Sequence, residues 1–406
     1  MDTGCDGAKG GGVKSNARIA CLLVDPSLYT GPYDAALTEG LLAAGVEPLW
    51  ATRPTRRGDE DAIPREHLAA IFYRRTDDTS SLSGWMRSLI KGCSHIVGLL
   101  RLMRLVARRR PQVVHIQWAV LPLIDAIAFW IIRLRTPIVM TVHDPTPYNG
   151  SRLTLFQQFG FDLPIRLANH VIVHTRSGRR KLLARGIDPT KISVVQHGPL
   201  HLRAIARAEA HERDGRYTFV LFGEIKEYKG LDVLVEALAQ LPAQVRDLLR
   251  VIVAGRARMD LSRILARIDA LSLSGTIDIQ PRRFSDQEMA DLFAAADCFV
   301  FPYREIDASG VYFLTKGLRK WLIASRVGVF AEDVAEGRNG VLIPSGDARE
   351  LANALQHAAL TRPGVPSISI QQSWSEIGHA TRATYERVLS KHARAVPVAD
   401  AGAADA

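Results

Sequence analysis

Residues 222–232 read FGEIKEYKGLD, and this stretch shows how the chain is organised. It starts at the end of an apolar run, passes through a loop with two lysines, and leads into a helix expected from Gly230. Gly223 lets the backbone approach a ligand closely, and a helix start offers N–H groups and the positive end of a dipole. Lys226 and Lys229 add positive charge. The pattern fits a phosphate site, and it also fits an ordinary helix start with solvated lysines.

Strands and helices alternate on both sides of this stretch. In the second half, strands are expected at 219–222, 251–254, 277–279, 298–301 and 322–324, and helices at 230–241, 261–271, 286–296 and 377–389. In the first half, strands are expected at 19–24, 46–51, 113–116, 138–142, 171–173 and 192–195, with a helix at 33–44. Such alternation is typical of parallel sheets covered by helices. We therefore predict an α/β fold with two Rossmann-like parallel-sheet domains facing a central cleft, followed by a C-terminal helix.

Composition sets the expected limits of these parts. The predicted division is 1–16 disordered, 17–200 first Rossmann-like domain, 201–216 linker, 217–370 second Rossmann-like domain, 371–393 C-terminal helix and 394–406 disordered tail. The linker segment is polar and charged and shows no strand pattern. Both ends of the chain are poor in large apolar residues, which is the composition of segments that do not fold alone.

The overall composition restricts the environment and the partners. The chain has 406 residues, 47% of them hydrophobic, and a formal net charge of +10. A basic balance suggests a polyanionic partner, either nucleic acid or an acidic lipid surface. The four cysteines are scattered without a C-x-x-C pair, which argues against a disulfide framework and a structural zinc site. We find no signal-peptide pattern and no transmembrane-length apolar stretch, so we expect a cytoplasmic protein.

A second polar loop follows the strand expected at 298–301. Residues 301–311 read FPYREIDASGV. Backbone N–H groups at Ser309 and Gly310 are placed to hold a phosphate or a sugar, and Asp307 is placed to accept hydrogen bonds from sugar hydroxyls. The alternative is an ordinary turn in which an Asp or Ser caps a helix. Alone, this loop does not decide between the two.

Together, several segments resemble family-4-like glycosyltransferases with the GT-B fold, of the bacterial exopolysaccharide or glycolipid type. In the second half the similar segments are 222–231, 254–256, 296–304, 323–325 and 337–347. In the first half they are VVHIQW at 113–118, TVHD at 141–144, VHT at 173–175 and QHG at 196–198. No single segment is specific, but their order and spacing are.

The resemblance implies transfer of a sugar from a nucleotide-diphosphate donor, UDP- or GDP-linked, to an acceptor held by the first domain. It places the donor diphosphate on Lys229 and on Lys226, where the family often has arginine, and it places His143 against the donor sugar. Asp307 matches the first of two carboxylates of the family. The second falls on Thr315 or, with a one-residue shift, on Leu314, so it is missing here.

The chemistry implied is neutralisation of the leaving diphosphate by the lysines and the helix start. No Asp-x-Asp motif stands at a strand end, so we expect no required metal. The family's retaining course is front-side attack guided by the leaving phosphate. An inverting relative needs a base from the first domain, for which Asp25 is the first candidate and Asp144 the second.

Residues 85–110 form an expected basic amphipathic helix with Trp85 at its start. Its arginines at helical spacing are Arg101, Arg104 and Arg108, and its apolar stripe is Leu99, Leu102, Met103 and Val106. Such a helix is typical of a membrane interface, while the alternative is a core-facing helix with a solvated arginine face. A second basic cluster lies at 176–185. We therefore expect an anionic membrane surface as partner, peripheral location on the inner membrane face, and a lipid-linked or saccharide acceptor.

Two other classes of function stay open on the sequence. The missing second carboxylate is compatible with a non-catalytic GT-B-like protein that binds a nucleotide sugar or a partner enzyme. The net charge is compatible with nucleic-acid binding, but no basic sheet with interleaved aromatics is found, so we expect no nucleic acid. A dinucleotide dehydrogenase is disfavoured because no G-x-G-x-x-G follows the first strand.

Overall fold

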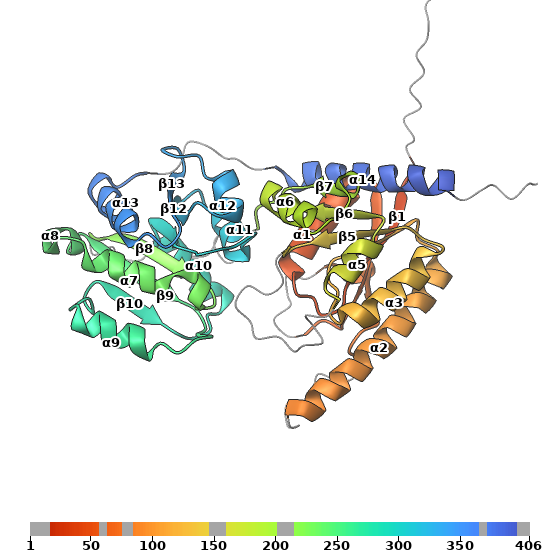
Figure 1. Ribbon diagram of the computed structural model, residues 1–406, viewed down its shortest axis with the longest axis horizontal. Coiled ribbons are helices and arrows are strands. Elements are labelled where there is room, and N and C mark those ends of the chain that lie inside the picture. Colours follow the sequence, from red (N-terminus) through yellow and green to blue (C-terminus); the bar gives the residue numbers. More distant parts are fainter. Residues whose placement is uncertain are drawn as a thin grey trace, which may run out of the picture.

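A computed structural model of the chain describes residues 17–56, 63–74, 84–145, 160–200, 215–364 and 372–395. These residues form two α/β lobes, with the first half of the chain in one lobe and the second half in the other (Figure 1). The ends expected to be disordered were 1–16 and 394–406; residues 1–16 and 396–406 lie outside the described residues, as do residues 201–214 of the expected linker, whereas residues 394 and 395 belong to the last helix.

The first lobe contains a seven-stranded, fully parallel sheet of order β3-β2-β1-β4-β5-β6-β7. Its strands are β1 Ile19–Asp25, β2 Val46–Thr52, β3 Leu68–Ala70, β4 Val113–Ile116, β5 Ile138–Val142, β6 His170–Val173 and β7 Ile192–Val194. The strand order reverses between β1 and β4. Residues after the carboxyl ends of such strands are therefore where a ligand is expected.

Side chains alternate across this sheet and bury two separate faces. Cys21 and Leu23 of β1 pack on the side of α1 (Gly31–Ala43), whereas Leu22 and Val24 pack on the opposite side. That opposite side is covered by α2 Gly84–Arg109, α3 Pro122–Arg133, α5 Asp162–Leu167 and α6 Arg176–Ala184. The helices supply Leu102, Phe129, Ile165 and Leu182 to this core. Burial on both faces explains why the strands read as continuous apolar runs.

The second lobe contains a six-stranded, fully parallel sheet of order β10-β9-β8-β11-β12-β13. Its strands are β8 Tyr217–Phe222, β9 Leu249–Ala254, β10 Ile277–Gln280, β11 Cys298–Phe301, β12 Trp321–Ser325 and β13 Gly340–Ile343. Its helices are α7 Leu231–Ala239, α8 Ala243–Arg246, α9 Ser262–Ala270, α10 Asp286–Ala295, α11 Gly310–Lys316, α12 Gly328–Asp333 and α13 Ala348–Thr361. The two parallel sheets confirm the predicted fold class; β13, α8, α12 and α13 are elements of this lobe that the sequence did not predict.

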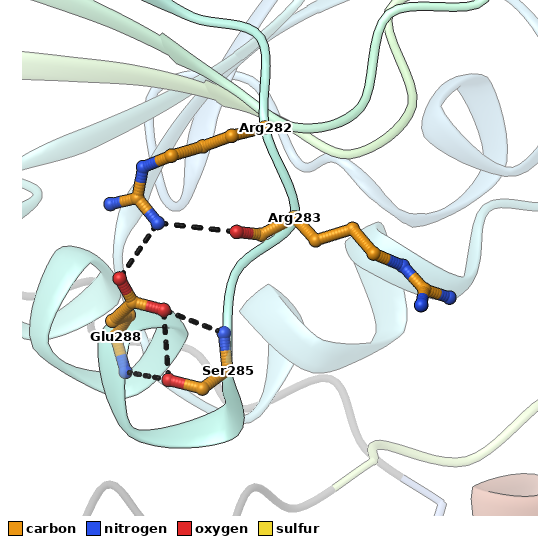
Figure 2. A network of polar contacts seen from close by, with 4 residues as sticks. All are labelled: Arg282, Arg283, Ser285 and Glu288. Atoms are coloured by element: carbon orange, nitrogen blue, oxygen red, sulfur yellow. Dashed lines mark hydrogen bonds and ion pairs between the residues drawn. The ribbon is translucent and has the colours of Figure 1, made fainter.

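The start of α10 shows how local sequence fixes an element of this lobe (Figure 2). The Ser285 hydroxyl accepts a hydrogen bond from the Glu288 backbone N–H at 3.3 Å, and the Glu288 carboxylate accepts one from the Ser285 backbone N–H at 2.8 Å. Arg282 donates to the same carboxylate at 2.7 Å. These contacts hold the pKa of Glu288 at about 2, chiefly through the backbone of Ser285. The pair is a capping box, which satisfies two backbone N–H groups at the start of the helix.

The last helix, α14 Trp374–Ala395, lies against the first lobe although it follows the second in sequence (Figure 1). It crosses α1 where Gly40 meets Gly378: a Cβ on Gly378 would lie 1.9 Å from the Gly40 carbonyl oxygen. The Tyr385 hydroxyl lies 2.7 Å from His115 Nδ1 in β4. The C-terminal helix therefore forms part of the first lobe's core. Of the helices described, none has the length and apolar character needed to cross a bilayer.

Candidate active site

Gly223 follows β8 directly and adopts a backbone conformation that favours glycine. Its φ is +107°, and its N–H donates to the Ala254 carbonyl oxygen at 2.9 Å. A Cβ at this position would lie 2.6 Å from Lys229 Nζ and 3.0 Å from a methyl carbon of Val311. The absence of a side chain at residue 223 thus lets a lysine ammonium and the start of α11 approach the end of β8.

Lys229 is a buried cation at this position. It ends the short helix η5 (Glu227–Lys229) and has an exposed fraction of 5%. Its ammonium donates to the Phe222 carbonyl oxygen at 3.3 Å and lies 5.4 Å from the centre of the Tyr303 ring. Burial, with a smaller contribution from Lys226, lowers the pKa of Lys229 to about 8. Because a desolvated cation is costly, an anionic ligand here is favoured.

The Lys226 ammonium is directed elsewhere than expected. It lies 3.1 Å from Glu224 Oε2, and the other carboxylate oxygen of Glu224, Oε1, accepts a hydrogen bond from Arg258 Nε at 2.7 Å. The expectation treated both lysines as open to a diphosphate, and it did not anticipate this acidic partner from the same loop. Lys226 therefore belongs to a surface ion-pair group, next to the site that Lys229 lines.

Ser309 and Gly310 begin α11 as the helix-cap alternative proposed. The Ser309 hydroxyl accepts from the Tyr312 backbone N–H at 3.4 Å, so it serves as the N-cap. Gly310 is exposed at the first helical position, and no heavy atom lies within 4 Å of a Cβ built on it. Since Val311 touches Gly223, the structure brings this helix start beside Gly223 and Lys229. Capping and ligand binding are compatible here, because one hydroxyl satisfies one of several N–H groups.

Asp307 lies between the two lobes. It has an exposed fraction of 1%, and its Oδ1 lies 2.8 Å from Lys181 Nζ in α6 of the first lobe. A second contact joins the lobes nearby, where the Glu332 carboxylate of α12 accepts from the backbone N–H groups of Arg176 and Ser177 at 2.8 and 2.7 Å. Residues after the carboxyl ends of both sheets therefore face one another, and the sugar-binding candidate sits where they meet.

Four histidines, in or after successive strands of the first lobe, form one cluster in which His143 is half-buried and the other three are buried. They are His115 in β4, His143 after β5, His174 after β6 and His197 after β7. Burial lowers the pKa of His115 to about 3 and that of His174 to about 4, and it holds the pKa values of His143 and His197 well below the ordinary range. All four rings are therefore neutral at physiological pH. A neutral imidazole serves as a hydrogen-bond partner rather than as a positive charge or a proton carrier.

His143 stands between two hydrogen-bond acceptors. His174 Nδ1 lies 3.0 Å from the Val195 carbonyl oxygen and must donate to it, so its Nε2 is left to accept. His143 Nδ1 lies 3.1 Å from that Nε2, and His143 Nε2 lies 2.9 Å from Gln117 Oε1, which also only accepts. A neutral His143 ring has one N–H, so it donates to one of these two acceptors and not to both. The ring is also stacked on Trp118, with centroids 5.0 Å apart and planes at 10°.

Asp25, the candidate base, ends β1 and is fully buried. Its carboxylate accepts from the backbone N–H groups of Ser27 and Thr30, both at 3.2 Å. Burial raises the pKa of Asp25, and burial followed by the Asp25 charge raises that of Asp34 well above its ordinary value. The Thr30 hydroxyl accepts from the Trp118 indole at 3.2 Å, so Asp25 is linked through Thr30 and Trp118 to His143. These contacts hold a turn together, which is a structural use of the carboxylate.

Asp144, the second candidate base, is half-buried after β5. Burial raises the pKa of Tyr228, in the second lobe, to about 12, and the Asp144 carboxylate adds to that shift. Asp144 therefore lies near Tyr228 and the loop after β8 in the other lobe. Of the two positions that match the missing second carboxylate, Thr315 and Leu314, Thr315 is buried, and its hydroxyl donates to the Tyr312 carbonyl oxygen at 2.9 Å.

Sequence reasoning missed several residues around His143. Tyr33 of α1 meets it edge to face at 5.0 Å, and His197 stacks on Phe313 of the second lobe with centroids 3.6 Å apart. The signal for the histidine cluster was present, because parallel strands place their carboxyl ends at one edge and a histidine stands at or after four of them in turn. Nothing comparable marks Tyr33 or Phe313 in the sequence.

A hollow of ≈ 310 Å³ lies at the opposite edge of the second sheet. It is lined by the starts of β8 and β12 together with Arg319 and Arg362. The residues named above gather at the carboxyl edge, so this hollow is separate from the candidate active site.

Comparison with known proteins adds the family. Residues 35–198 match the glycosyltransferase family 4 domain, and residues 216–360 match the domain described as glycosyl transferases group 1. The chain belongs to the family 4, group 1 glycosyltransferases and is a nucleotide-sugar glycosyltransferase of the GT-B fold. The family matches and the two sheets confirm the resemblance that the sequence motifs indicated.

Individual relatives are distant. The D-inositol 3-phosphate glycosyltransferase of Thermobispora bispora is 25% identical over 402 residues, covering 90% of this chain and 91% of that protein. HepE of Anabaena, solved with UDP-glucose, superposes with a TM-score of 0.61 at 16% identity, covering 93% of this chain and 100% of HepE. The catalytic domain of starch synthase IV from Arabidopsis thaliana, bound to ADP and acarbose, superposes with a TM-score of 0.65 at 11% identity. That superposition covers 92% of this chain and 100% of the starch synthase chain. The two structures establish the fold.

Proposed function

We propose that the chain transfers a hexosyl group from a UDP- or GDP-linked sugar to a lipid-linked or saccharide acceptor in exopolysaccharide or glycolipid synthesis. The observation that carries the proposal is the buried ammonium of Lys229 beside Gly223, at the carboxyl edge of the second sheet. A cation held at this depth favours a diphosphate, and the start of α11 lies against the same glycine. The relative solved with UDP-glucose supports a UDP-linked hexose among the donors.

The proposed reaction retains the configuration at the anomeric carbon. The bond from that carbon to the donor phosphate oxygen breaks, a bond to the acceptor oxygen forms on the same face, and the acceptor proton passes to the leaving phosphate. Lys229 and the start of α11 stabilise the charge that develops on the diphosphate, so no metal ion is required. His143 and Asp307 contact the sugar, with Ser309 and Gly310 beside the diphosphate and Lys226 at its rim. Under this course neither Asp25 nor Asp144 acts as a base.

The acceptor belongs to the first lobe, where the histidine cluster and the basic helix α6 lie. The Thermobispora relative is named for an inositol phosphate acceptor, which supports an anionic or polyol group as one class to test. We also propose a cytoplasmic protein that acts peripherally on an anionic membrane surface, with no nucleic acid as partner. The basic residues of α2 and α6 support attraction to such a surface.

A second candidate is a protein that binds the nucleotide sugar without transferring it. The buried Thr315 favours it, because the family's second carboxylate is replaced by a side chain turned to the helix backbone. One experiment separates the two. The full chain is incubated with radiolabelled UDP- and GDP-hexoses and with lipid, saccharide and inositol phosphate acceptors, and label transfer and nucleoside diphosphate release are measured. Transfer supports the enzyme, whereas saturable donor binding without transfer or hydrolysis supports the binding protein.

A further inference from the structure

Helix α3 is apolar on nearly all sides. Residues 122–133 read PLIDAIAFWIIR, with Asp125 as the sole acidic residue. That carboxylate is turned inward, where it lies 2.6 Å from His95 Nε2 of α2 and accepts from the Leu121 backbone N–H at 2.8 Å. A helix that is hydrophobic all round belongs either inside a large core or against lipid. Within the described part of the chain, the neighbours of α3 cover one face only, so its other face requires an explanation.

The outward face of α3 carries large apolar side chains. Ile127, Trp130 and Leu134 have exposed fractions of 63%, 54% and 65%. Leu123 and Ile131 continue the same stripe at 44% and 41%. The inward face, with Phe129 and Ile132, is already packed in the core of the first lobe. The exposed stripe therefore does not contribute to the core of the first lobe. A contiguous apolar patch of this kind on a protein surface marks an interaction surface.

The neighbouring helix α2 adds a second stripe, which is not the one the sequence indicated. Leu99, Leu102 and Val106, expected at a membrane, are buried in the core, so the core-facing alternative holds for that stripe. The exposed apolar residues of α2 are Trp85 71%, Leu89 60%, Ile90 37%, Ile96 42%, Val97 43% and Leu100 46%. α2 and α3 pack side by side at one edge of the first lobe, and the start of α2 projects beyond it (Figure 1).

The charge around these stripes has one sign. Between residues 84 and 135 the basic residues are Arg87, Lys91, Arg101, Arg104, Arg108, Arg109, Arg110, Arg133 and Arg135. Asp125 is the one acidic residue in this range, and it is buried. Arg108, Arg109 and Arg110 are exposed at the end of α2, and Arg135 is exposed just after α3. This combination matches an anionic lipid surface. The apolar side chains would contact the acyl chains, and the surrounding arginines and lysine would contact the lipid phosphates.

We propose that the outward stripes of α2 and α3 form one docking surface for an anionic phospholipid bilayer, with Ile127, Trp130 and Leu134 as anchors that enter the interface. A second copy of the chain fits this surface less well, because a two-fold contact would bring the same cations together without acidic partners. The proposal gives the predicted membrane partner a different attachment site, and it rests on the proposed function only for the lipid-linked acceptor.

The test uses the full chain and vesicles of phosphatidylcholine with or without phosphatidylglycerol, measured by co-sedimentation. We expect wild type to bind the vesicles that contain phosphatidylglycerol and not to bind the pure phosphatidylcholine vesicles. Added salt should release the protein from the phosphatidylglycerol vesicles. The double variant Ile127→Ser/Trp130→Ser should partition to these vesicles at least about tenfold more weakly, because it lacks two apolar anchors that would enter the bilayer interface. Leu360→Ser, which removes an apolar side chain of 57% exposure on α13 in the other lobe, is the matched control and should bind as wild type does.

Two readouts keep the outcomes distinct. UDP-induced thermal stabilisation should be the same in wild type and the double variant, since the donor site lies in the other lobe; a loss of both would point to misfolding, and Ile127→Gln alone would then be tested in its place. Equal vesicle binding by the Ile127→Ser/Trp130→Ser double variant and wild type overturns the proposal. So does a wild-type dimer in gel filtration that becomes monomeric in the double variant, because the surface would then be a contact between copies.

Discussion

Lys181 in the first lobe and Asp307 in the second form an ion pair, with Nζ 2.8 Å from Oδ1. Asp307 is almost completely buried, whereas the lysine side chain is 38% exposed. The contact joins the helix after β6 to the loop after β11, so it links the carboxyl edges of both sheets. A donor sugar that hydrogen-bonds to Asp307 must do so beside this cation, which couples sugar recognition to the approach of the lobes.

Asp307→Asn should weaken sugar recognition while sparing nucleotide binding. The amide keeps the shape of the side chain but loses charge-assisted hydrogen bonds, which are worth about 1.5–3 kcal/mol each. We expect kcat/KM for the nucleotide sugar to fall roughly 10- to 150-fold, with the affinity for free UDP unchanged. Lys181→Gln is the companion variant, since it removes the partner and leaves the carboxylate. Equal losses of UDP and nucleotide-sugar affinity in Asp307→Asn would assign the residue to the nucleotide instead.

Donor affinity should decline in mild alkali because of Lys229. Burial lowers the pKa of this ammonium to about 8, so the cation is present below pH 8 and is lost above it. If the neutral amine does not bind the diphosphate, the apparent Kd for UDP should rise about tenfold per pH unit above that value. Lys229→Arg, which stays charged, should remove this pH dependence even if it binds more weakly. A wild-type Kd that is constant through pH 9 would show that the charge of Lys229 is not used.

Gly223→Ala should reduce both stability and donor binding. An L-residue at a φ of +107° is strained, by about 1–2 kcal/mol for a left-handed conformation. The new methyl group would also lie 2.6 Å from Lys229 Nζ and must displace it. Gly275→Ala, where no heavy atom lies within 4 Å, serves as the control. Thermal unfolding and UDP titration of both variants measure the effect; a Gly223→Ala protein with wild-type UDP affinity would rule out the close approach as a binding feature.

The histidine cluster should make the fold sensitive to acid. In the unfolded chain these rings take protons near pH 6.5, whereas in the folded chain His174 does so at about pH 4 and His115 at about pH 3. The unfolded state therefore binds more protons below pH 6.5, and stability should be complete above that pH and decrease steadily as the pH falls toward 4. Urea unfolding midpoints across this range provide the measurement. His115→Gln should flatten the slope, and an unchanged slope would mean that the ring is not buried in its neutral form.

The residues that could be placed from sequence are those whose role is set by local pattern. Alternating apolar runs predicted both sheets, and the pattern around Gly223 and Lys229 predicted a loop between a strand and a helix start, which the structure has between β8 and α7. The pairing of Lys226 with Glu224 was equally local, but two opposite charges in one loop do not reveal whether they meet each other or a ligand.

Features that depend on contacts between distant segments could not be placed. Nothing in the sequence near Asp307 indicates Lys181, which lies in another lobe. The apolar stripe of α2 at Leu99 and Leu102 has the same helical period whether it faces lipid or core, and only the packing of the sheet shows that it faces the core. For the same reason the exposed stripe of α3, around Trp130, resembles a buried helix in sequence.

The proposed function requires Lys229 and Gly223 to bind a nucleoside diphosphate at the carboxyl edge of the second sheet. Isothermal titration of UDP into wild type and Lys229→Met at pH 7 tests it most directly, with the unliganded melting temperature of each as the check on folding. We expect a single saturable site in wild type and at least about tenfold weaker binding in the variant, because the variant loses one charge-assisted contact. Equal affinity in the two proteins, or no binding of UDP or GDP by wild type, would contradict it.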